Sequence, residues 1–258
     1  MGERPMPYVT YERKDHIAII TLNRPERLNA LGRELMQQLR EAQNRFATDD
    51  DAWVAIFTGA GDRAFCAGLD LKEAAERGRE GDALLPGRAS GPLETDKPSI
   101  AAVNGICYGG GFELVQGCDV RICSENAVFA MAEVKAGRVP VTGLFDLPRL
   151  VGQSNAMWII LSGEPIDAQE AYRIGLVTKL MPLSELMPTA LAMAKTICGN
   201  APLGVRAAKR VVKLGAEVPK DYARRLAASL IDSVWGSEDA AEATVAFAEK
   251  RTPVWKMR

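Results

Sequence analysis

Two glutamates and a run of glycines lie close together in the middle of the sequence. Glu113 comes just after Gly109, Gly110 and Gly111, and Glu133 follows it twenty residues later. Glycine lets a backbone approach a ligand closely, and the first N–H groups of a helix have no partner within the helix. Such N–H groups can stabilise a developing oxyanion, and two neighbouring carboxylates can divide acid and base work. The segment therefore predicts proton transfer beside a stabilised oxyanion.

The elements that would position these residues alternate between strand and helix patterns. Strands are expected over residues 8–10, 17–22, 54–57, 99–103 and 120–123, and a helix over residues 32–46. Glu113 falls on a helix between the last two strands. This alternation predicts an α/β layer with a mostly parallel sheet. Residues 78–94 are rich in Gly, Arg, Pro and Ser without periodicity, which predicts a mobile loop.

The last third of the chain has helical patterns almost throughout. Helices are expected over residues 183–198, 203–214, 220–235 and 239–250. We therefore expect an α/β core in residues 1–182 and a helical subdomain in residues 183–258. The helices carry more apolar side chains than a small subdomain needs, which predicts self-association.

Composition restricts the class of protein. The chain has 258 residues, of which 47% are hydrophobic and 25% charged, as is ordinary for a soluble globular protein with one large domain. Its net charge of −1 gives no overall attraction for nucleic acid or an anionic membrane surface. No signal peptide and no apolar stretch of membrane-spanning length is recognisable, so no membrane insertion is expected. Five cysteines without a CxxC pair predict reduced thiols and a cytoplasmic location.

The sequence contains a single histidine, His16. It lies where a hairpin turn is expected, so we interpret it as structural. Because no other histidine is present, we expect neither a catalytic system that pairs a histidine with a serine or cysteine nor a histidine-based metal site. No metal is predicted.

Four segments together resemble the crotonase (enoyl-CoA hydratase/isomerase) superfamily. They are residues 23–25 with 28–31 (NRP and LNAL), residues 64–73 (AFCAGLDLKE), residues 97–113 from Lys97-Pro98 to Glu113, and Glu133. The resemblance runs over essentially the whole chain. It implies a crotonase-like ββα spiral core with a C-terminal helical trimerisation region, assembled as a homotrimer or as a homohexamer made of two trimers.

The resemblance also implies a reaction. In this family two backbone N–H groups polarise a thioester carbonyl, and they would belong here to Leu69 and Gly110. Glu113 would deprotonate the water that attacks the β-carbon, and Glu133 would exchange the proton at the α-carbon. The implied activity is reversible syn hydration of a 2-enoyl-CoA to a 3-hydroxyacyl-CoA. No cofactor is implied, because coenzyme A is part of the acyl-CoA thioester substrate.

Coenzyme A itself would bind at two loops and, in family members, often at a neighbouring subunit. The resemblance assigns this role to Leu28, Ala30, Ala67, Gly68, Asp70, Lys72, Phe247 and Lys250. Lys72 would meet the phosphates. Phe247 and Lys250 match the segment of the last helix that contributes to the site, although core packing and a helix-end charge are equally compatible with them.

The sequence departs from the family in the loop after Glu133. Residues 137–145 contain Val141 and Leu144 in place of the usual glycine-rich stretch, and they also contain Arg138. We expect an altered pocket and an acyl group other than a simple straight chain. A guanidinium such as that of Arg138 can bind a carboxylate, but we interpret Arg138 as a structural or solvent-facing arginine. Isomerase, dehydratase, hydrolase and decarboxylase activities stay open.

A non-catalytic binder of coenzyme A thioesters or an RNA-binding relative is the alternative from a different class. The helix expected at residues 32–46 mixes arginines with glutamates and is followed by three aspartates, Asp49, Asp50 and Asp51. It therefore lacks the continuous basic face that favours RNA.

Overall fold

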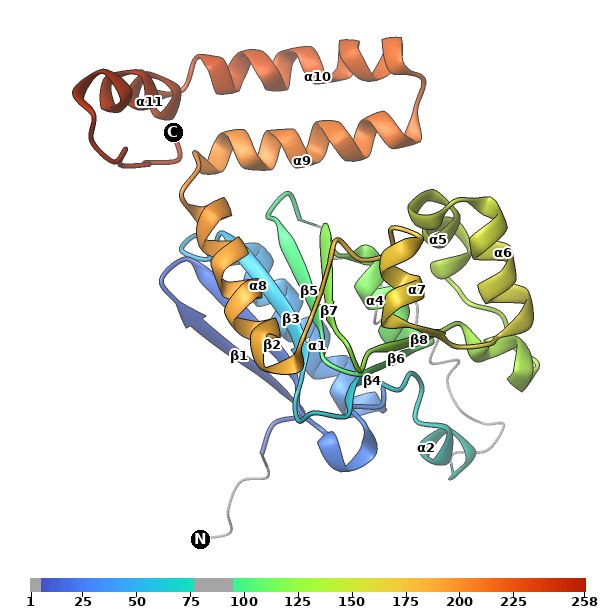
Figure 1. Ribbon diagram of the computed structural model, residues 1–258. Coiled ribbons are helices and arrows are strands. Elements are labelled where there is room, and N and C mark those ends of the chain that lie inside the picture. The colour runs from blue at the N-terminus through green and yellow to red at the C-terminus, as the bar shows by residue number, and fades with distance from the viewer. Residues whose placement is uncertain (1–5, 77–94) are drawn as a thin grey trace, which may run out of the picture.

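A six-stranded β-sheet, the larger of the two in the described residues, runs through the centre of the molecule (Figure 1). The computed structural model describes residues 6–76 and 95–258. The sheet order is β1 (Val9–Lys14), β2 (Ile17–Leu22), β3 (Val54–Gly59), β5 (Ser99–Val103), β7 (Val120–Ser124) and β10 (Lys179–Met181). Strands β1 and β2 are antiparallel, and every other neighbouring pair is parallel. The expected mostly parallel sheet is confirmed.

A smaller sheet lies across one end of the larger one (Figure 1). Its order is β4 (Ala64–Cys66), β6 (Ile106–Tyr108), β8 (Val128–Ala130) and β9 (Ile166–Asp167). Strands β4, β6 and β8 each follow a strand of the larger sheet along the chain. The chain therefore repeats strand, strand and helix, which is the ββα spiral that the family resemblance implied.

Shorter helices connect these strands. They are η1 (Pro25–Arg27), α2 (Leu71–Glu76), α4 (Gly110–Gly117), η3 (Ala132–Ala136), α5 (Gly143–Val151), α6 (Gln153–Ser162) and α7 (Ala168–Arg173). The helix expected around Glu113 is thus α4, whereas Glu133 lies on a short 3-10 helix.

Two apolar clusters cover the two faces of the larger sheet. Side chains alternate between faces along a strand, so Ile20 of β2 joins one cluster and Ile17, three residues earlier, joins the other. Helix α1 (Arg33–Thr48) packs on the first face, where Leu39 is fully buried. Helix α8 (Leu183–Cys198) packs on the opposite face through its buried residue Ala190.

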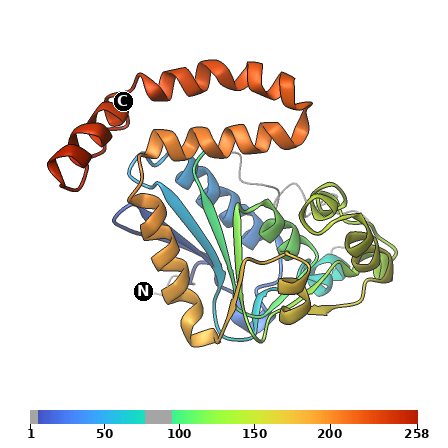
Figure 2. The same ribbon diagram turned by 45° about the horizontal axis from the view of Figure 1, so that its top comes forward.

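Helices α9 (Pro202–Glu217), α10 (Lys220–Trp235) and α11 (Glu238–Glu249) extend away from the sheets (Figures 1 and 2). The expected boundary at residues 182 and 183 falls before α8. However, apolar contacts place α8 with the core. The part of the chain that leaves the core therefore begins at α9.

An ion pair holds α9 over the end of the sheet. The Nζ atom of Lys209 lies 2.8 Å from Asp119 and donates to the carbonyl of Lys97 at 2.7 Å. Asp119 also accepts the N–H of Ser99, the first residue of β5, at 2.8 Å. Because the Lys209 side chain is only 8% exposed, water weakens this pair little.

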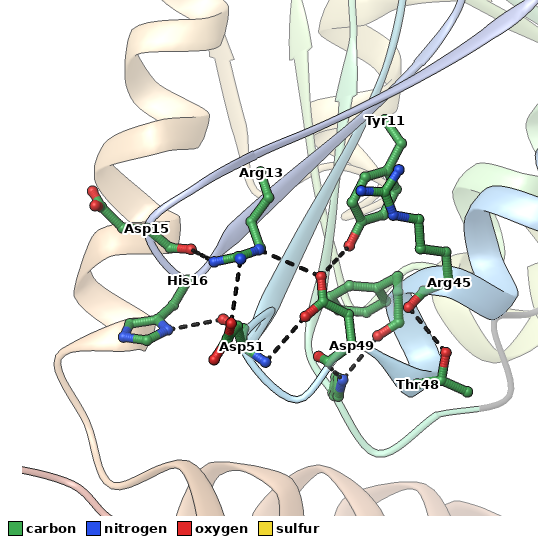
Figure 3. A network of polar contacts seen from close by, with 10 residues as sticks. Tyr11, Arg13, Asp15, His16, Arg45, Thr48, Asp49 and Asp51 are labelled. Atoms are coloured by element: carbon green, nitrogen blue, oxygen red, sulfur yellow. Dashed lines mark hydrogen bonds and ion pairs between the residues drawn. The ribbon is translucent and has the colours of Figure 1, made fainter.

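The turn between β1 and β2 is tied to the end of α1 by the polar network in Figure 3. Nδ1 of His16 lies 2.8 Å from the carbonyl oxygen of Asp51, and its ring stacks on Trp53 with 3.6 Å between centroids. Arg13 bridges Asp49 and Asp51. These contacts confirm a structural role for His16.

The loop expected at residues 78–94 lies outside the described residues. Among the helices of the two described ranges, none combines the length and apolar character needed to cross a membrane.

Candidate active site

Two glycine turns meet beside the smaller sheet. Gly68 and Gly109 both have positive φ, at +85° and +52°, a conformation that glycine adopts at little cost. A Cβ atom on Gly68 would lie 3.6 Å from the Cα of Gly109, so the two backbones are in contact. Within residues 6–76 and 95–258, neither the N–H of Leu69 nor that of Gly110 donates a hydrogen bond. The structure thus brings together the two turns whose N–H groups the family resemblance assigned to an oxyanion hole.

Parallel strand pairing explains this meeting point. Strands β4 and β6 are neighbours and parallel, so their carboxyl ends reach the same edge. One continues into Gly68 and the other into Gly109. Helix α4 then begins at Gly110 and packs so closely on β4 that a Cβ on Gly111 would lie 2.5 Å from the Cβ of Cys66. Glycine at position 111 is therefore needed for packing.

Glu113 is anchored on one side by the loop after Glu133. Its side chain lies on the first turn of α4 and is 2% exposed. Oε1 accepts the N–H groups of Val141, Thr142 and Gly143, at 2.7, 2.8 and 3.1 Å. Oε2 makes no hydrogen bond to any described residue, so it is available to water or substrate.

The non-glycine loop therefore contributes through its backbone. An N–H group is independent of side-chain size, and Val141 donates as a glycine could. The larger side chains of Leu144 and Phe145 are exposed, the latter by 67%. Arg138 is exposed as well, and its N–H donates to the carbonyl of Glu133.

Glu133 lies beside the same helix end. Its Oε1 would be 3.2 Å from a Cβ on Gly109. Its Oε2 is buried and has no hydrogen-bond partner in the described part of the chain. Burial raises the pKa of Glu133, and the charge of nearby Glu113 acts in the same direction. The two carboxyl groups therefore interact, and Glu133 keeps its proton to higher pH than an ordinary glutamate.

The two loops assigned to coenzyme A lie side by side. The N–H of Ala67 donates to the carbonyl of Leu28 at 3.0 Å, and the N–H of Leu31 donates to that of Gly68 at 2.7 Å. Ala30 is buried between these contacts. Asn29, which sequence reasoning did not assign, is fully buried, and its Nδ2 donates to the carbonyl of Ala64. Asn29 therefore holds the loop in place. An asparagine at an expected turn is the sequence feature that could have indicated this role.

Asp70 and Lys72 have different environments. Asp70 is 6% exposed, accepts Nη1 of Arg24 at 2.8 Å and accepts the N–H of Glu73 at 3.1 Å. Its carboxylate therefore stabilises the start of α2 and faces Arg24. Lys72 is exposed on α2, where a phosphate could reach it.

Phe247 and Lys250 are not brought to these loops within one chain. They lie at the end of α11, which is remote from α2 in both views (Figures 1 and 2). Phe247 is 87% exposed. A coenzyme A contact from these residues requires a neighbouring subunit.

The cysteines and acidic residues form no metal site in the part of the chain that the structure describes. There, no group of three or more His, Cys, Asp or Glu side chains could hold a metal ion. All five cysteines are free, and four of them are buried.

Two sheets built from ββα units, with glutamates beside N–H groups that have no partner among the described residues, define a crotonase-type protein. The sequence profile described as Enoyl-CoA hydratase/isomerase matches residues 12–258. The chain belongs to this family of enzymes.

Known relatives are similar over nearly the full length. (E)-benzylidenesuccinyl-CoA hydratase of Thauera aromatica is 39% identical over 96% of this chain and 98% of its own. Carnitinyl-CoA dehydratase of Salmonella typhi is 42% identical over 95% and 97%. The crystal structure of enoyl-CoA hydratase from Mycobacterium tuberculosis H37Rv has a TM-score of 0.91 and 34% identity, covering 98% of this chain and 100% of that one.

Proposed function

We propose that this protein catalyses the reversible syn hydration of a 2-enoyl-CoA to a 3-hydroxyacyl-CoA. The observation that carries the proposal is the pair of interacting glutamates beside the free N–H groups of Leu69 and Gly110. The names of the relatives describe addition of water and its removal, which are the two directions of one reaction.

The oxyanion hole would stabilise the enolate. The thioester carbonyl oxygen accepts the N–H groups of Leu69 and Gly110, and these bonds strengthen as negative charge develops on the oxygen. Loss of one such donor typically costs about 2.7–4 kcal/mol of transition-state stabilisation.

The glutamates would move the protons. Oε2 of Glu113 takes one proton from water while the water oxygen forms a bond to the β-carbon. Glu133, protonated at the start, gives its proton to the α-carbon. One proton is held by the pair before and after the reaction, so the step balances. The raised pKa of Glu133 supports its role as the acid.

Binding of coenzyme A would use the two adjoining loops. Leu28, Ala30, Ala67 and Gly68 offer backbone to the adenine, Lys72 meets a phosphate, and Asp70 orders α2. Phe247 and Lys250 come from a neighbouring subunit of a homotrimer or a homohexamer. No separate cofactor takes part, and the setting is cytoplasmic.

The acyl group is proposed to differ from a simple straight chain. The benzylidenesuccinyl and carnitinyl groups in the relatives' names are both substituted acyl groups. Exposed apolar side chains at Leu144 and Phe145 lie next to the loop that anchors Glu113, and Arg138 adds a positive charge there.

A panel of enoyl- and 3-hydroxyacyl-CoA thioesters tests the proposal. Purified protein should change the absorbance of the conjugated thioester and alter the product mass by one water. Glu113→Gln and Glu133→Gln should each lower kcat by about 100-fold or more, since each removes one proton-transfer group. Binding of the thioester, measured by calorimetry, should stay close to that of the unmodified protein. Absence of water addition across the panel, or near-normal kcat in either variant, contradicts the proposal.

A further inference from the structure

A buried amide lies behind Glu113. Gln116 is one turn further along α4, so its side chain is on the same helix face as Glu113. It is 5% exposed, and its Oε1 is buried without a partner among the described residues. Its Nε2 lies 3.6 Å from the sulfur of Met131, a weak contact for an amide. The side-chain amide of Gln116 is therefore left largely unsatisfied by the described residues.

A buried hydroxyl lies next to the same turn. Thr142 donates its N–H to Glu113, but its Oγ1 is buried and has no partner within the described ranges. It precedes α5 without capping it through the side chain. The amide atoms of Gln116 are 3.4 and 3.5 Å from where a Cβ on the adjacent Gly143 would lie. Both unpaired groups therefore adjoin the loop that anchors Glu113.

Buried polar groups in folded proteins are almost always paired with protein or with ordered water. A bound water needs two or more polar partners, which this amide oxygen and this hydroxyl can supply. We propose that Gln116 and Thr142 bind one buried water molecule between them, and that this water holds the 141–143 turn so that Glu113 is correctly positioned. The inference rests on the hydration reaction proposed above.

Both residues act through Glu113 and are positioning residues. The water links α4 to the 141–143 turn, whose N–H groups fix Oε1 of Glu113. Without the link, the turn has more freedom, and Oε2 spends less time in line with the attacking water. Loss of alignment lowers the rate of the chemical step more than it lowers binding.

Single substitutions test this arrangement. Gln116→Met and Thr142→Val should each lower kcat by about tenfold while KM stays within about twofold. Thr142→Ser keeps the hydroxyl and should restore kcat. Gln43→Met is the matched control, because Gln43 also has a buried amide nitrogen without a partner among residues 6–76 and 95–258 but lies on α1. If both single variants have the same kcat as the Gln43→Met control, the proposal is overturned.

The double variant tests the shared water. Both substitutions remove the same water, so Gln116→Met combined with Thr142→Val should have a kcat within about twofold of the slower single variant. If the fold-losses of kcat in the two single variants multiply in the double variant, the bridging water is ruled out. If Gln116→Met does not fold, Thr142→Val compared with Thr142→Ser still decides the role of the hydroxyl.

Amide hydrogen exchange provides a readout without turnover. The N–H groups of Val141, Thr142 and Gly143 should exchange about tenfold faster in both single variants than in the Gln43→Met control. Unchanged exchange overturns the positioning role. A protein that hydrates no enoyl-CoA refutes the proposed function instead, and the exchange rates then decide this inference separately.

Discussion

The two glutamates of the candidate site differ in how their carboxyl groups are held. Glu113 has one oxygen fixed by three N–H groups, whereas Glu133 has a buried oxygen without a partner in the described residues. The first environment supports a carboxylate in a fixed orientation. The second supports a group that carries a proton. At the scale of single residues, these different surroundings agree with the proposed roles of Glu113 as base and Glu133 as acid.

Glu133→Gln should stabilise the folded protein at alkaline pH. The folded-state pKa of Glu133 is raised, so its stabilising contribution is present below the unfolded pKa and is lost as pH rises through the folded pKa. A neutral glutamine removes that loss. A gain of about 1 kcal/mol would raise Tm by about 2–4 °C near pH 8, with the difference shrinking toward pH 4.

Thermal unfolding over a pH series measures this effect. Glu113→Gln is the matched control, since it weakens the three charge-assisted hydrogen bonds and should give no gain. A lower Tm for Glu133→Gln at pH 8 would contradict the prediction.

At the scale of elements, two short parallel strands deliver the glycine turns to one point. Strands β4 and β6 have three residues each, and such short runs carry little periodicity in a sequence. The sequence therefore predicted the long strands of the larger sheet, but not the smaller sheet. The glycines that follow β4 and β6 were nevertheless recognisable in the sequence. The structure shows why glycine is needed at positions 68 and 109, because both have positive φ and their backbones are in close contact.

Gly109→Ala should impair the chemical step. A methyl group there meets Glu133 Oε1 at 3.2 Å in a backbone conformation that disfavours a side chain, and this displaces the N–H of Gly110. We expect kcat to fall by about 100- to 1000-fold, as for loss of an oxyanion-hole donor.

Gly175→Ala is the control for backbone strain. Gly175 also has positive φ, but nothing lies within 4 Å of the added Cβ. It should lose about 1–2 kcal/mol of stability with kcat unchanged. Equal losses of kcat in steady-state assays of the two variants would argue against a specific role for the Gly109 turn.

At the scale of the whole molecule, the last three helices leave an apolar surface uncovered in one chain. Exposed apolar side chains in this region include Leu226, Ile231, Trp235, Val245 and Phe247. Surfaces of this kind in soluble proteins usually mark an interface. Self-association through α9, α10 and α11 stays a prediction.

The mass in solution should be about three or six times the 27.9 kDa of one chain, as measured by light scattering or native mass spectrometry. Phe247→Ala should raise KM for the thioester by about tenfold with little change in kcat, because it removes contact with a distant part of the substrate. Tyr172→Ala, which truncates an exposed aromatic side chain on α7, should leave KM unchanged. A stable monomer would count against a shared coenzyme A site.

Local patterns in the sequence determined the family, the long strands of the larger sheet and the residue types of the candidate site. Glu113, Glu133 and the glycine turns follow from spacing, and helices α8 and α10 from apolar periodicity, because these signals are contained in neighbouring residues. Contacts between distant segments were decided only by the tertiary structure. Glu113 meets Val141 across 28 positions, α8 packs on the sheet, and Glu133 has a raised pKa because folding buries it. Hydrogen bonding and desolvation depend on three-dimensional proximity, which the order of residues does not state.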